Sequence, residues 1–445
     1  MAQAAFRFPC GGNSHTYKDL SAFVKTCEGM EAMHSETLAR AKTKLGSPLG
    51  RWWRGQGRTS VDSRAKTLRP VSSGRILAVL GLPAVFLVLG LALRYLAYAS
   101  VDPQATLARF PDALCLWDCR WYVGLAENGY DPFPSPGMVN AGNWAFFPLF
   151  PVLVGLLRLA IPAPTILVAT GASLVLAYGA VLAAWPLLRD LRAYLLYAAF
   201  VLCGPFSIYF STFYTEVLFV LLATAGFVAL QQRNYLLAAL CGALLSATRI
   251  VGVFFVLAIL AQAFLDHRAR GGRVLDFVPA VLRRADLVLA IFLAPLGLFL
   301  YMAFLHWHIG DALAFSHVQR AWAREVGNPL LYLWRGLTRF PAEGFVPTVS
   351  QQLALAAVTG LALTAMLFWR RRVPAALFSL VCILVPLAAG LASMVRFMVA
   401  QPPLVLQLME LLGRSRIAIV LALAGFLVAD YYFTIAWLGG YLTLV

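Results

Sequence analysis

Charged side chains are scarce in this chain. Only 13% of its 445 residues are charged, 61% are hydrophobic, and the mean hydropathy is +0.76. Soluble globular domains carry about 25% charged residues. A transmembrane helix needs about 20 mostly apolar residues, and from Ile76 onward the sequence supplies one such segment after another. The composition excludes a soluble domain and indicates a polytopic membrane protein.

Acidic residues are scarcer than basic residues, with 20 Asp and Glu against 36 Lys and Arg. The basic excess lies in the amino-terminal tail and in short turns between apolar segments, which is the positive-inside distribution. We therefore expect the basic turns to face the cytoplasm, and we expect membrane lipids and no nucleic acid among the partners. These turns are residues 189–192, 231–234, 267–284, 370–372 and 414–416.

Cysteine is also rare. The seven cysteines include no CxxC pair and no Cys/His cluster, which excludes a zinc module and a disulfide framework. Cys115 and Cys119 flank Asp118 in an expected external loop, where a disulfide is chemically possible. Cysteines four residues apart on a helix rarely satisfy the bridge geometry, so both states stay open.

The sequence before residue 75 contains no apolar segment of the kind found in a signal peptide. We expect residues 76–98 to be an uncleaved signal anchor and residues 1–75 to be a cytoplasmic, basic and largely disordered tail. The tail either fixes the topology or binds anionic lipid headgroups. Residues 76–445 then form one transmembrane domain.

The alternation of basic turns and apolar segments predicts an all-α membrane helix bundle with about eleven crossings. Its first external loop extends over residues 100–163. Within this loop, residues 144–161 are apolar enough to cross, but a crossing there would move every later basic turn outside, so we expect an interfacial helix instead. The expected crossings are residues 76–98, 164–188, 194–210, 217–230, 235–248, 251–265, 287–305, 353–369, 375–391, 397–412 and 417–438.

The external loop contains the strongest candidate for a catalytic group. Trp117, Trp121 and Tyr122 are expected to face the membrane interface on a short helix, with Asp118 one turn away from Tyr122. A carboxylate held above the membrane by aromatic anchors is well placed to take a proton from a hydroxyl group. The alternative is that Asp118 only caps the helix or pairs with Arg120.

Three further charged residues interrupt apolar sequence. Glu216 begins an apolar helix, where either the helix dipole or a function explains a carboxylate at the membrane boundary. Arg249 lies in the middle of apolar sequence, and it either binds a phosphate group or pairs with Glu216 or Asp118. Arg396 precedes a short apolar run and is either a second phosphate ligand or a side chain that reaches the interface.

A second external loop, residues 306–350, mixes histidine, aromatic and basic residues. His317 and Arg320 suit sugar binding there, beside Trp322. His306 and His308 do not share a helix face, so we expect no metal site at these two residues. We expect no cofactor, and the sequence leaves a requirement for a divalent metal ion open.

The run from Trp117 to Tyr122, followed by Glu127, Tyr130 and residues 145–151, resembles the first motif of the PIG-V mannosyltransferases. Residues 213–216 and 247–252 resemble the second and third motifs of that family. The resemblance covers residues 117–252 with specific motifs and extends more loosely to the end of the sequence, through Arg396 and Pro402. The tail before Ile76 has no counterpart in the family.

The resemblance implies a GT-C fold and the transfer of mannose from a polyprenyl-phosphate donor to an extracytoplasmic lipid or glycan acceptor. In that reaction Asp118 is the general base, and a single displacement inverts the anomeric centre. The implied ligands of the donor phosphate are Arg249, Arg396 and Arg320. The implied substrate-binding residues are Trp117, Trp121, Tyr122, Glu127, Tyr130, Tyr214, Glu216 and His317.

The sequence departs from the eukaryotic members at Trp121, where they have histidine, and at Val217, where a small residue is usual. Those members build the glycosylphosphatidylinositol anchor. The Ala-, Leu- and Arg-rich composition is typical of bacteria, so we expect a bacterial plasma membrane and a different acceptor. A transporter or flippase for lipid-linked glycans and a non-catalytic membrane subunit are the alternatives. A transporter is expected to have duplicated broken helices with ionisable residues near the midplane, and this sequence shows neither.

Overall fold

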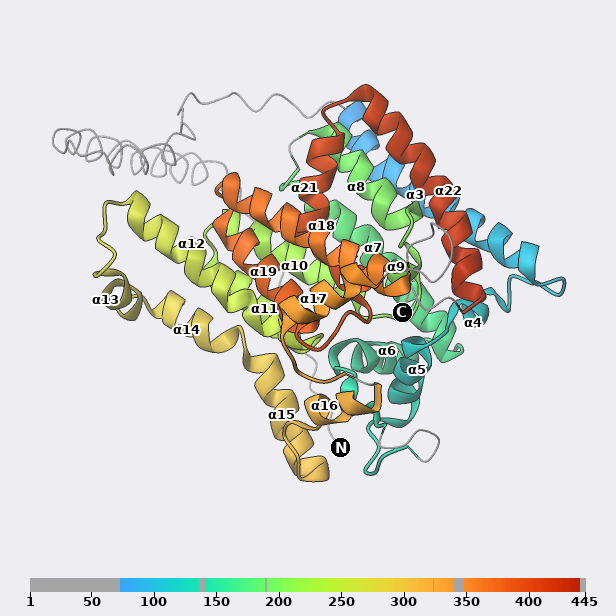
Figure 1. Ribbon diagram of the computed structural model, residues 1–445, viewed down its shortest axis with the longest axis horizontal. Helices are drawn as coiled ribbons and strands as arrows, with labels where there is room; N and C mark the ends of the chain where they lie inside the picture. The colour runs from blue at the N-terminus through green and yellow to red at the C-terminus, as the bar shows by residue number, and fades with distance from the viewer. Residues whose placement is uncertain (1–72, 136–140, 189, 323, 340–347, 441–445) are drawn as a thin grey trace, which may run out of the picture. The chain divides into compact units, whose positions relative to one another are not determined.

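The structure, a computed structural model, describes residues 73–135, 141–188, 190–322, 324–339 and 348–440. Contacts divide the chain into residues 1–67 and residues 68–445, and all the described residues belong to the second unit. Their regular secondary structure is helical, with no strand in the described ranges (Figure 1). The predicted all-α membrane fold is confirmed. The predicted basic tail, residues 1–75, lies outside the described residues except for the start of helix α3.

The long helices carry most of the apolar sequence. By length and composition, five helical segments in the described part are able to cross a membrane. They are α3 (Ser73–Val101), α7 (Thr165–Ala184), the segment made of η2 (Ile250–Phe254) and α12 (Phe255–Ala269), α18 (Val349–Trp369) and α22 (Arg416–Leu438).

A sixth span is broken in the middle. Helices α14 (Ala285–Leu293) and α15 (Leu296–Ile309) meet at a bend of 41°. Pro295 lies at this break and explains it, since proline has no N–H group and its ring clashes with the preceding turn.

Shorter apolar helices fill the rest of the bundle. They are α6 (Leu149–Ala160), α8 (Leu191–Cys203), α10 (Glu216–Gln231), α11 (Tyr235–Ser246), α19 (Val373–Leu387) and α21 (Pro402–Leu412). Each of the eleven predicted crossings coincides with one or two helices, but only five or six are long enough to cross alone. The number of crossings stays a prediction.

Two predicted crossings have different ends in the structure because of proline and glycine. The segment predicted over 194–210 ends early, at Cys203, because Gly204 and Pro205 follow it. The segment predicted over 397–412 is divided between α20 (Met394–Val399) and α21, because Pro402 begins a new helix.

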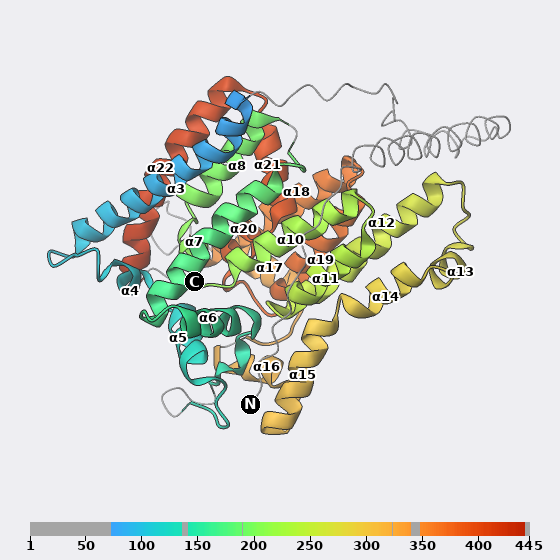
Figure 2. The same cartoon turned by 180° about the vertical axis from the view of Figure 1, so that it is seen from behind.

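The first and last helices of the bundle lie side by side with α8, as Figures 1 and 2 both show. An ion pair buried between them joins Arg94 Nη1 of α3 to Asp430 Oδ1 of α22 at 3.2 Å, and both side chains are almost completely inaccessible to solvent. Ser207 Oγ donates a hydrogen bond to the same carboxylate at 2.7 Å. A charge buried in this way must be paired, so this contact fixes the register of the two ends of the bundle.

The predicted external loops form short helices. The first loop contains α4 (Phe110–Leu114), α5 (Asp118–Asn128), η1 (Asn143–Ala145) and α6, and the second contains α16 (Ala314–His317), η3 (Val318–Trp322) and α17 (Pro329–Thr338). In Figures 1 and 2, α5, α6 and α16 gather at one end of the bundle. A helix of the 12 residues of α6 is about 18 Å long, less than the ~30 Å hydrocarbon core. Helix α11, a predicted crossing, has the same length, so the interfacial position of α6 stays a prediction.

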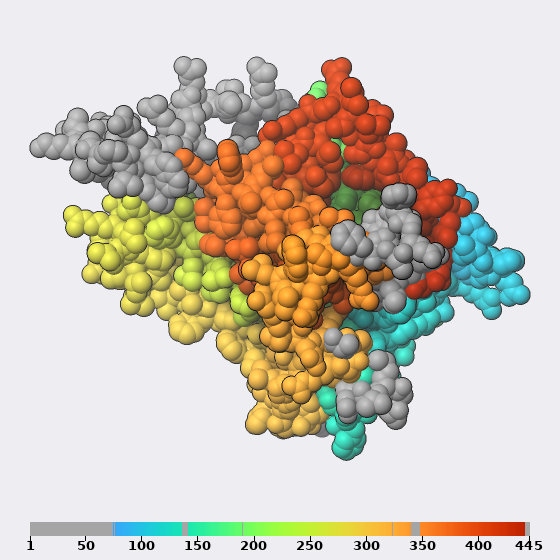
Figure 3. Space-filling view, in the orientation of Figure 1, coloured from blue at the N-terminus to red at the C-terminus, as the bar shows by residue number. Residues whose placement is uncertain are grey.

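The second predicted external loop lies on the surface of the described part. Figure 3 shows this orange segment on one face, between the teal first loop and the red carboxyl-terminal helices. The remaining short helices are α9 (Ile208–Ser211) and α13 (Phe277–Leu282).

Candidate active site

A chain of ion pairs joins four side chains that are far apart in the sequence. Asp118 Oδ2 lies 2.6 Å from Arg396 Nη1, and Arg396 Nε lies 2.9 Å from Glu216 Oε1. The same Glu216 oxygen lies 2.5 Å from Arg249 Nη1. The structure thus brings the predicted base and two of the three predicted phosphate ligands to one place.

Local structure explains why these residues stand where they do. Asp118 and Glu216 are the first residues of α5 and α10, where a carboxylate interacts favourably with the positive end of the helix dipole. Arg249 has an extended backbone between α11 and η2. A Cβ on Gly252 would lie 2.2 Å from the carbonyl group of Leu245, so the chain can return this closely to α11 only at a glycine.

The carboxylates of Asp118 and Glu216 differ in solvent exposure. The Glu216 side chain is only 2% exposed and lies beneath the site, where it bridges two arginines. The Asp118 side chain is 22% exposed. Of the two carboxylates, Asp118 is therefore the one that a substrate can reach, and the geometry gives no support to the predicted contact of Glu216 with sugar hydroxyls.

A cavity of about 320 Å³ lies against Asp118, Arg249 and Arg396. One part of its lining is polar and the other part is apolar. Its other polar or hydrogen-bonding lining residues are Tyr122, Thr215, Thr248, Ser316, Gln319, Trp322 and Arg324. Its apolar lining includes Phe146, Phe147, Phe315, Val326, Val385, Pro386 and Phe397. The cavity therefore suits a ligand with an anionic head and an apolar tail.

Arg324 is a site residue that the sequence analysis missed. Its Nη2 donates a hydrogen bond to Ser393 Oγ at 3.0 Å, and it makes no ion pair among the residues that the structure describes. Burial, together with the positive charge of Arg396, lowers the pKa of Arg324 to about 10. A cation destabilised in this way is stabilised by an anion that enters the cavity.

The third predicted phosphate ligand lies elsewhere. Arg320 is exposed and does not line the cavity. It stands four residues before Arg324 in the same loop, and the spacing of two arginines in a polar loop does not reveal which of them points inward. The structure therefore puts Arg324, not Arg320, beside the other two arginines.

Three predicted substrate-binding residues lie at or beside the cavity. Tyr122 lines it, with its hydroxyl 3.3 Å from Thr215 Oγ1. The Trp121 ring stacks on Phe146, a lining residue, with centroids 5.6 Å apart. The Tyr214 ring faces the guanidinium of Arg396 at 5.5 Å.

The other predicted substrate-binding residues do not line the cavity. Tyr130 donates a hydrogen bond to the carbonyl oxygen of Phe146 at 2.6 Å, and Glu127 accepts one from Thr165 at 2.5 Å. His317 is exposed and pairs with Asp311 at 2.8 Å, and Trp117 is 37% exposed. A helix such as α5 turns side chains of one motif to different faces, which explains why only part of the motif reaches the cavity.

The described residues settle the state of two cysteines and show how the possible metal ligands are distributed. Cys115 and Cys119 form a disulfide, which resolves the alternative left open by the sequence. Within the described ranges, no three His, Cys, Asp or Glu side chains are grouped as a metal site requires. The positive charges of this site are guanidinium groups.

No protein-family model matches the chain, and no curated protein matches it. Among solved structures the chain is similar to the archaeal oligosaccharyltransferase AglB from Archaeoglobus fulgidus, in complex with an inhibitory peptide and a dolichol-phosphate, at 12% identity and a TM-score of 0.42. It is also similar to the apo form of the Archaeoglobus fulgidus oligosaccharyltransferase, at 13% identity and a TM-score of 0.43. The matches cover 82% of this chain and 56% of each archaeal chain, so the chain spans little more than half of their length. The function of the chain is therefore argued from its own residues.

Proposed function

We propose that the chain is a GT-C glycosyltransferase of the PIG-V kind, which transfers a mannosyl residue from a polyprenyl-phosphate donor to an extracytoplasmic lipid or glycan acceptor. The observation that carries the proposal is the contact of Asp118 with Arg396 at the wall of an amphiphilic cavity. A carboxylate, a group of arginines and apolar lining residues are the three parts that transfer from a lipid phosphate needs.

The charges of the site favour a donor with a single phosphate. Three guanidinium groups, from Arg249, Arg324 and Arg396, stand against the two carboxylates of Asp118 and Glu216, which leaves one positive charge. A sugar joined to a lipid through one phosphate is a phosphodiester with one negative charge, which balances the site. The guanidinium groups also suit the planar geometry of phosphate oxygens.

Asp118 acts as the general base in this proposal. Arg396 binds its Oδ2, and no described residue donates a hydrogen bond to its Oδ1, which leaves Oδ1 to accept a proton. Asp118 takes the proton of the acceptor hydroxyl, whose oxygen forms a bond to the anomeric carbon. The bond from that carbon to the phosphate oxygen breaks, and its electron pair stays on the phosphate. One displacement of this kind inverts the anomeric centre.

Arg249, Arg324 and Arg396 stabilise the negative charge that develops on the departing phosphate. The apolar lining around Phe397 and Val385 holds the first part of the polyprenyl chain. Trp121 and Trp322, which meet edge to face beside Phe146, supply aromatic surface for sugar stacking at the mouth of the cavity.

The disulfide supports an extracytoplasmic site. Disulfides persist in oxidising compartments and are rare in the cytosol. The Cys115–Cys119 bridge directly flanks Asp118, so we propose that the cavity opens outside and that the basic turns face the cytoplasm of a plasma membrane.

The test is an in vitro assay of the purified protein with labelled polyprenyl-phosphate mannose and extracted membrane lipids. We expect Asp118→Asn to lower the rate by about a thousandfold or more, because the amide cannot accept the proton. Asp112→Asn is the matched control, since Asp112 is an exposed carboxylate of the same loop that pairs only with Arg120. Full activity of Asp118→Asn removes this mechanism. Movement of a labelled lipid-linked glycan across liposomes with its sugar–phosphate bond intact favours the flippase.

A further inference from the structure

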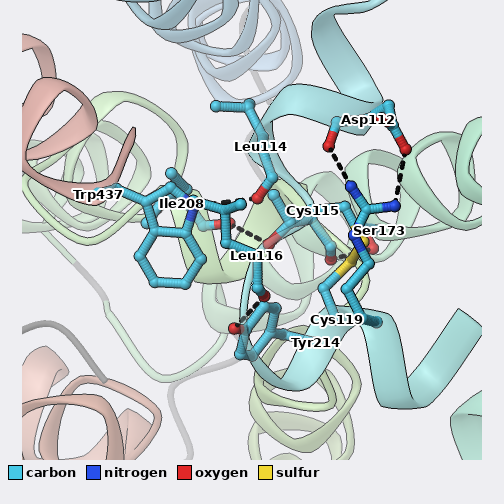
Figure 4. The surroundings of a disulfide bond; sticks show 11 residues. Asp112, Leu114, Cys115, Leu116, Cys119, Ser173, Ile208, Tyr214 and Trp437 are labelled. Atoms are coloured by element: carbon cyan, nitrogen blue, oxygen red, sulfur yellow. Dashed lines mark hydrogen bonds and ion pairs between the residues drawn. A yellow bond between two sulfur atoms is a disulfide. The ribbon is translucent and has the colours of Figure 1, made fainter. Parts of the chain in front are cut away.

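The turn that precedes Asp118 is closed by the disulfide between Cys115 and Cys119 (Figure 4). Both cysteines are completely buried. The bridge encloses Leu116, Trp117 and Asp118, so the proposed base is part of the ring that the disulfide closes. No other described disulfide exists, and the remaining described cysteines are free and buried.

The backbone inside this ring is strained at one residue. Trp117 has φ 55° and ψ −122°, a conformation that a residue with a large side chain rarely adopts. It is also the residue immediately before α5, so its backbone sets the direction of the Asp118 side chain. The native surroundings must hold Trp117 in this conformation.

Two hydrogen bonds hold the turn from the other side. The indole nitrogen of Trp437 donates a hydrogen bond to the carbonyl oxygen of Leu114 at 2.9 Å. The hydroxyl of Tyr214 donates one to the carbonyl oxygen of Leu116, also at 2.9 Å. Figure 4 shows Trp437 and Tyr214 on one side of the turn and the disulfide on the other. The Tyr214 ring also faces the guanidinium of Arg396, so the same contacts position both members of the Asp118–Arg396 pair.

We propose that the Cys115–Cys119 disulfide is a positioning element for the reaction: it holds Trp117 in its strained conformation and thereby directs the Asp118 carboxylate toward Arg396 and the cavity. This inference rests on the proposed function, because it assigns to the bridge the alignment of the proposed base. A disulfide that closes so short a loop contributes less to global stability through chain entropy than one that closes a long loop. We therefore expect loss of the bridge to lower kcat clearly while the melting temperature changes little.

The principal variant is Cys115→Ala combined with Cys119→Ala, with Cys203→Ala as the control for the loss of a buried cysteine outside the turn. We expect kcat of the double variant to fall by about tenfold to a hundredfold, as displaced catalytic groups usually cause. The KM for the donor stays within about threefold, because the phosphate ligands are unchanged. A double variant with the kcat of the wild type overturns the inference.

A rescue separates strain from other effects of the bridge. Glycine adopts the backbone conformation of Trp117 without a steric penalty. We therefore expect Trp117→Gly, added to the cysteine-free turn, to recover part of the lost kcat, measured against Trp117→Gly alone. No recovery by glycine in a folded, cysteine-free protein contradicts the role assigned to the bridge.

A second measurement needs no variant. The purified wild-type protein is reduced with tris(2-carboxyethyl)phosphine, and mass spectrometry of alkylated peptides gives the fraction of opened bridges. We expect kcat to fall in proportion to that fraction while the melting temperature changes little, and native protein with free Cys115 and Cys119 and full activity overturns the inference. Asp118→Asn in the same assay tests the proposed function separately: if it is inactive while reduced protein is fully active, only the inference on the disulfide fails.

Discussion

Arg396 Nη1 lies 2.6 Å from Asp118 Oδ2, although 278 residues separate the two in the sequence. Arg396 is 7% exposed and also contacts the buried Glu216. One guanidinium group therefore joins an accessible carboxylate to an inaccessible one. An arginine is suited to this position because its planar group presents several N–H donors in fixed directions.

Replacement of Arg396 by lysine keeps the positive charge but removes the N–H donors that the guanidinium group holds in fixed directions. Arg396→Lys cannot reproduce the separate contacts of Nη1 with Asp118 and of Nε with Glu216. We expect kcat to fall by about a hundredfold, and we expect the melting temperature to change little. Arg372→Lys, at an exposed arginine that pairs with Glu410, is the control. Wild-type kcat in Arg396→Lys would show that charge alone is sufficient here.

Arg324 and Arg320 provide a matched pair of variants. Both are arginines of the second external loop, but only Arg324 lines the cavity. We expect Arg324→Gln to raise the donor KM or lower kcat so that kcat/KM falls by about tenfold to a hundredfold, the effect of a lost charged hydrogen bond. Arg320→Gln should leave kcat/KM within about twofold. Equal losses in both variants, or a loss only in Arg320→Gln, would restore the prediction made from the sequence.

The sequence predicts the site best where a charge interrupts apolar residues. Glu216, Arg249 and Arg396 are conspicuous for this reason, since a charge in lipid needs a partner or a function. The sequence alone leaves open whether Arg249 binds a carboxylate or an anion, and in the structure it contacts Glu216 and also lines the cavity. The structure thus shows the contact with a carboxylate, and the contact with a phosphate stays a prediction.

Residues in polar surroundings give no such signal. Arg324 is one of several charged residues in its loop, so its inward direction is visible only in the tertiary structure. The turn that contains Trp117 and the Cys115–Cys119 bridge contacts Trp437 and Tyr214, which come from distant segments. The apolar pattern likewise predicts where helices lie but not where proline and glycine divide them, as at Gly204 and Pro402.

The buried pair of Arg94 and Asp430 predicts an effect on stability without an effect on chemistry. Arg94→Met leaves Asp430 buried without its partner, and breaking such a pair costs about 3–5 kcal/mol. We expect a clearly lower melting temperature in detergent, with unchanged kcat for the folded fraction. Arg94→Met combined with Asp430→Leu should recover much of the loss, since it removes both charges. A double variant no more stable than Arg94→Met would contradict this explanation.

Chelation tests the proposal that guanidinium groups stabilise the phosphate. Arg249, Arg324 and Arg396 supply the positive charge at the cavity, so we expect activity to be unchanged after treatment with EDTA and dialysis. The measurement is the initial rate with and without added Mg²⁺ or Mn²⁺. Loss of activity on chelation and recovery with either ion would show that a metal ion takes part.

Accessibility of single cysteines tests the side of the membrane on which the site opens. Pro132 lies in the first predicted external loop and Arg270 in a basic turn after α12, and both are exposed. In intact cells, with Cys10 and Cys27 replaced, we expect Pro132→Cys to react with a membrane-impermeant maleimide and Arg270→Cys to react only after the membrane is opened. The three free cysteines of the described part are buried and should contribute little labelling. The reverse pattern would place Asp118 on the cytoplasmic side, where a disulfide is rarely maintained, and would overturn the proposed topology together with the role of the bridge.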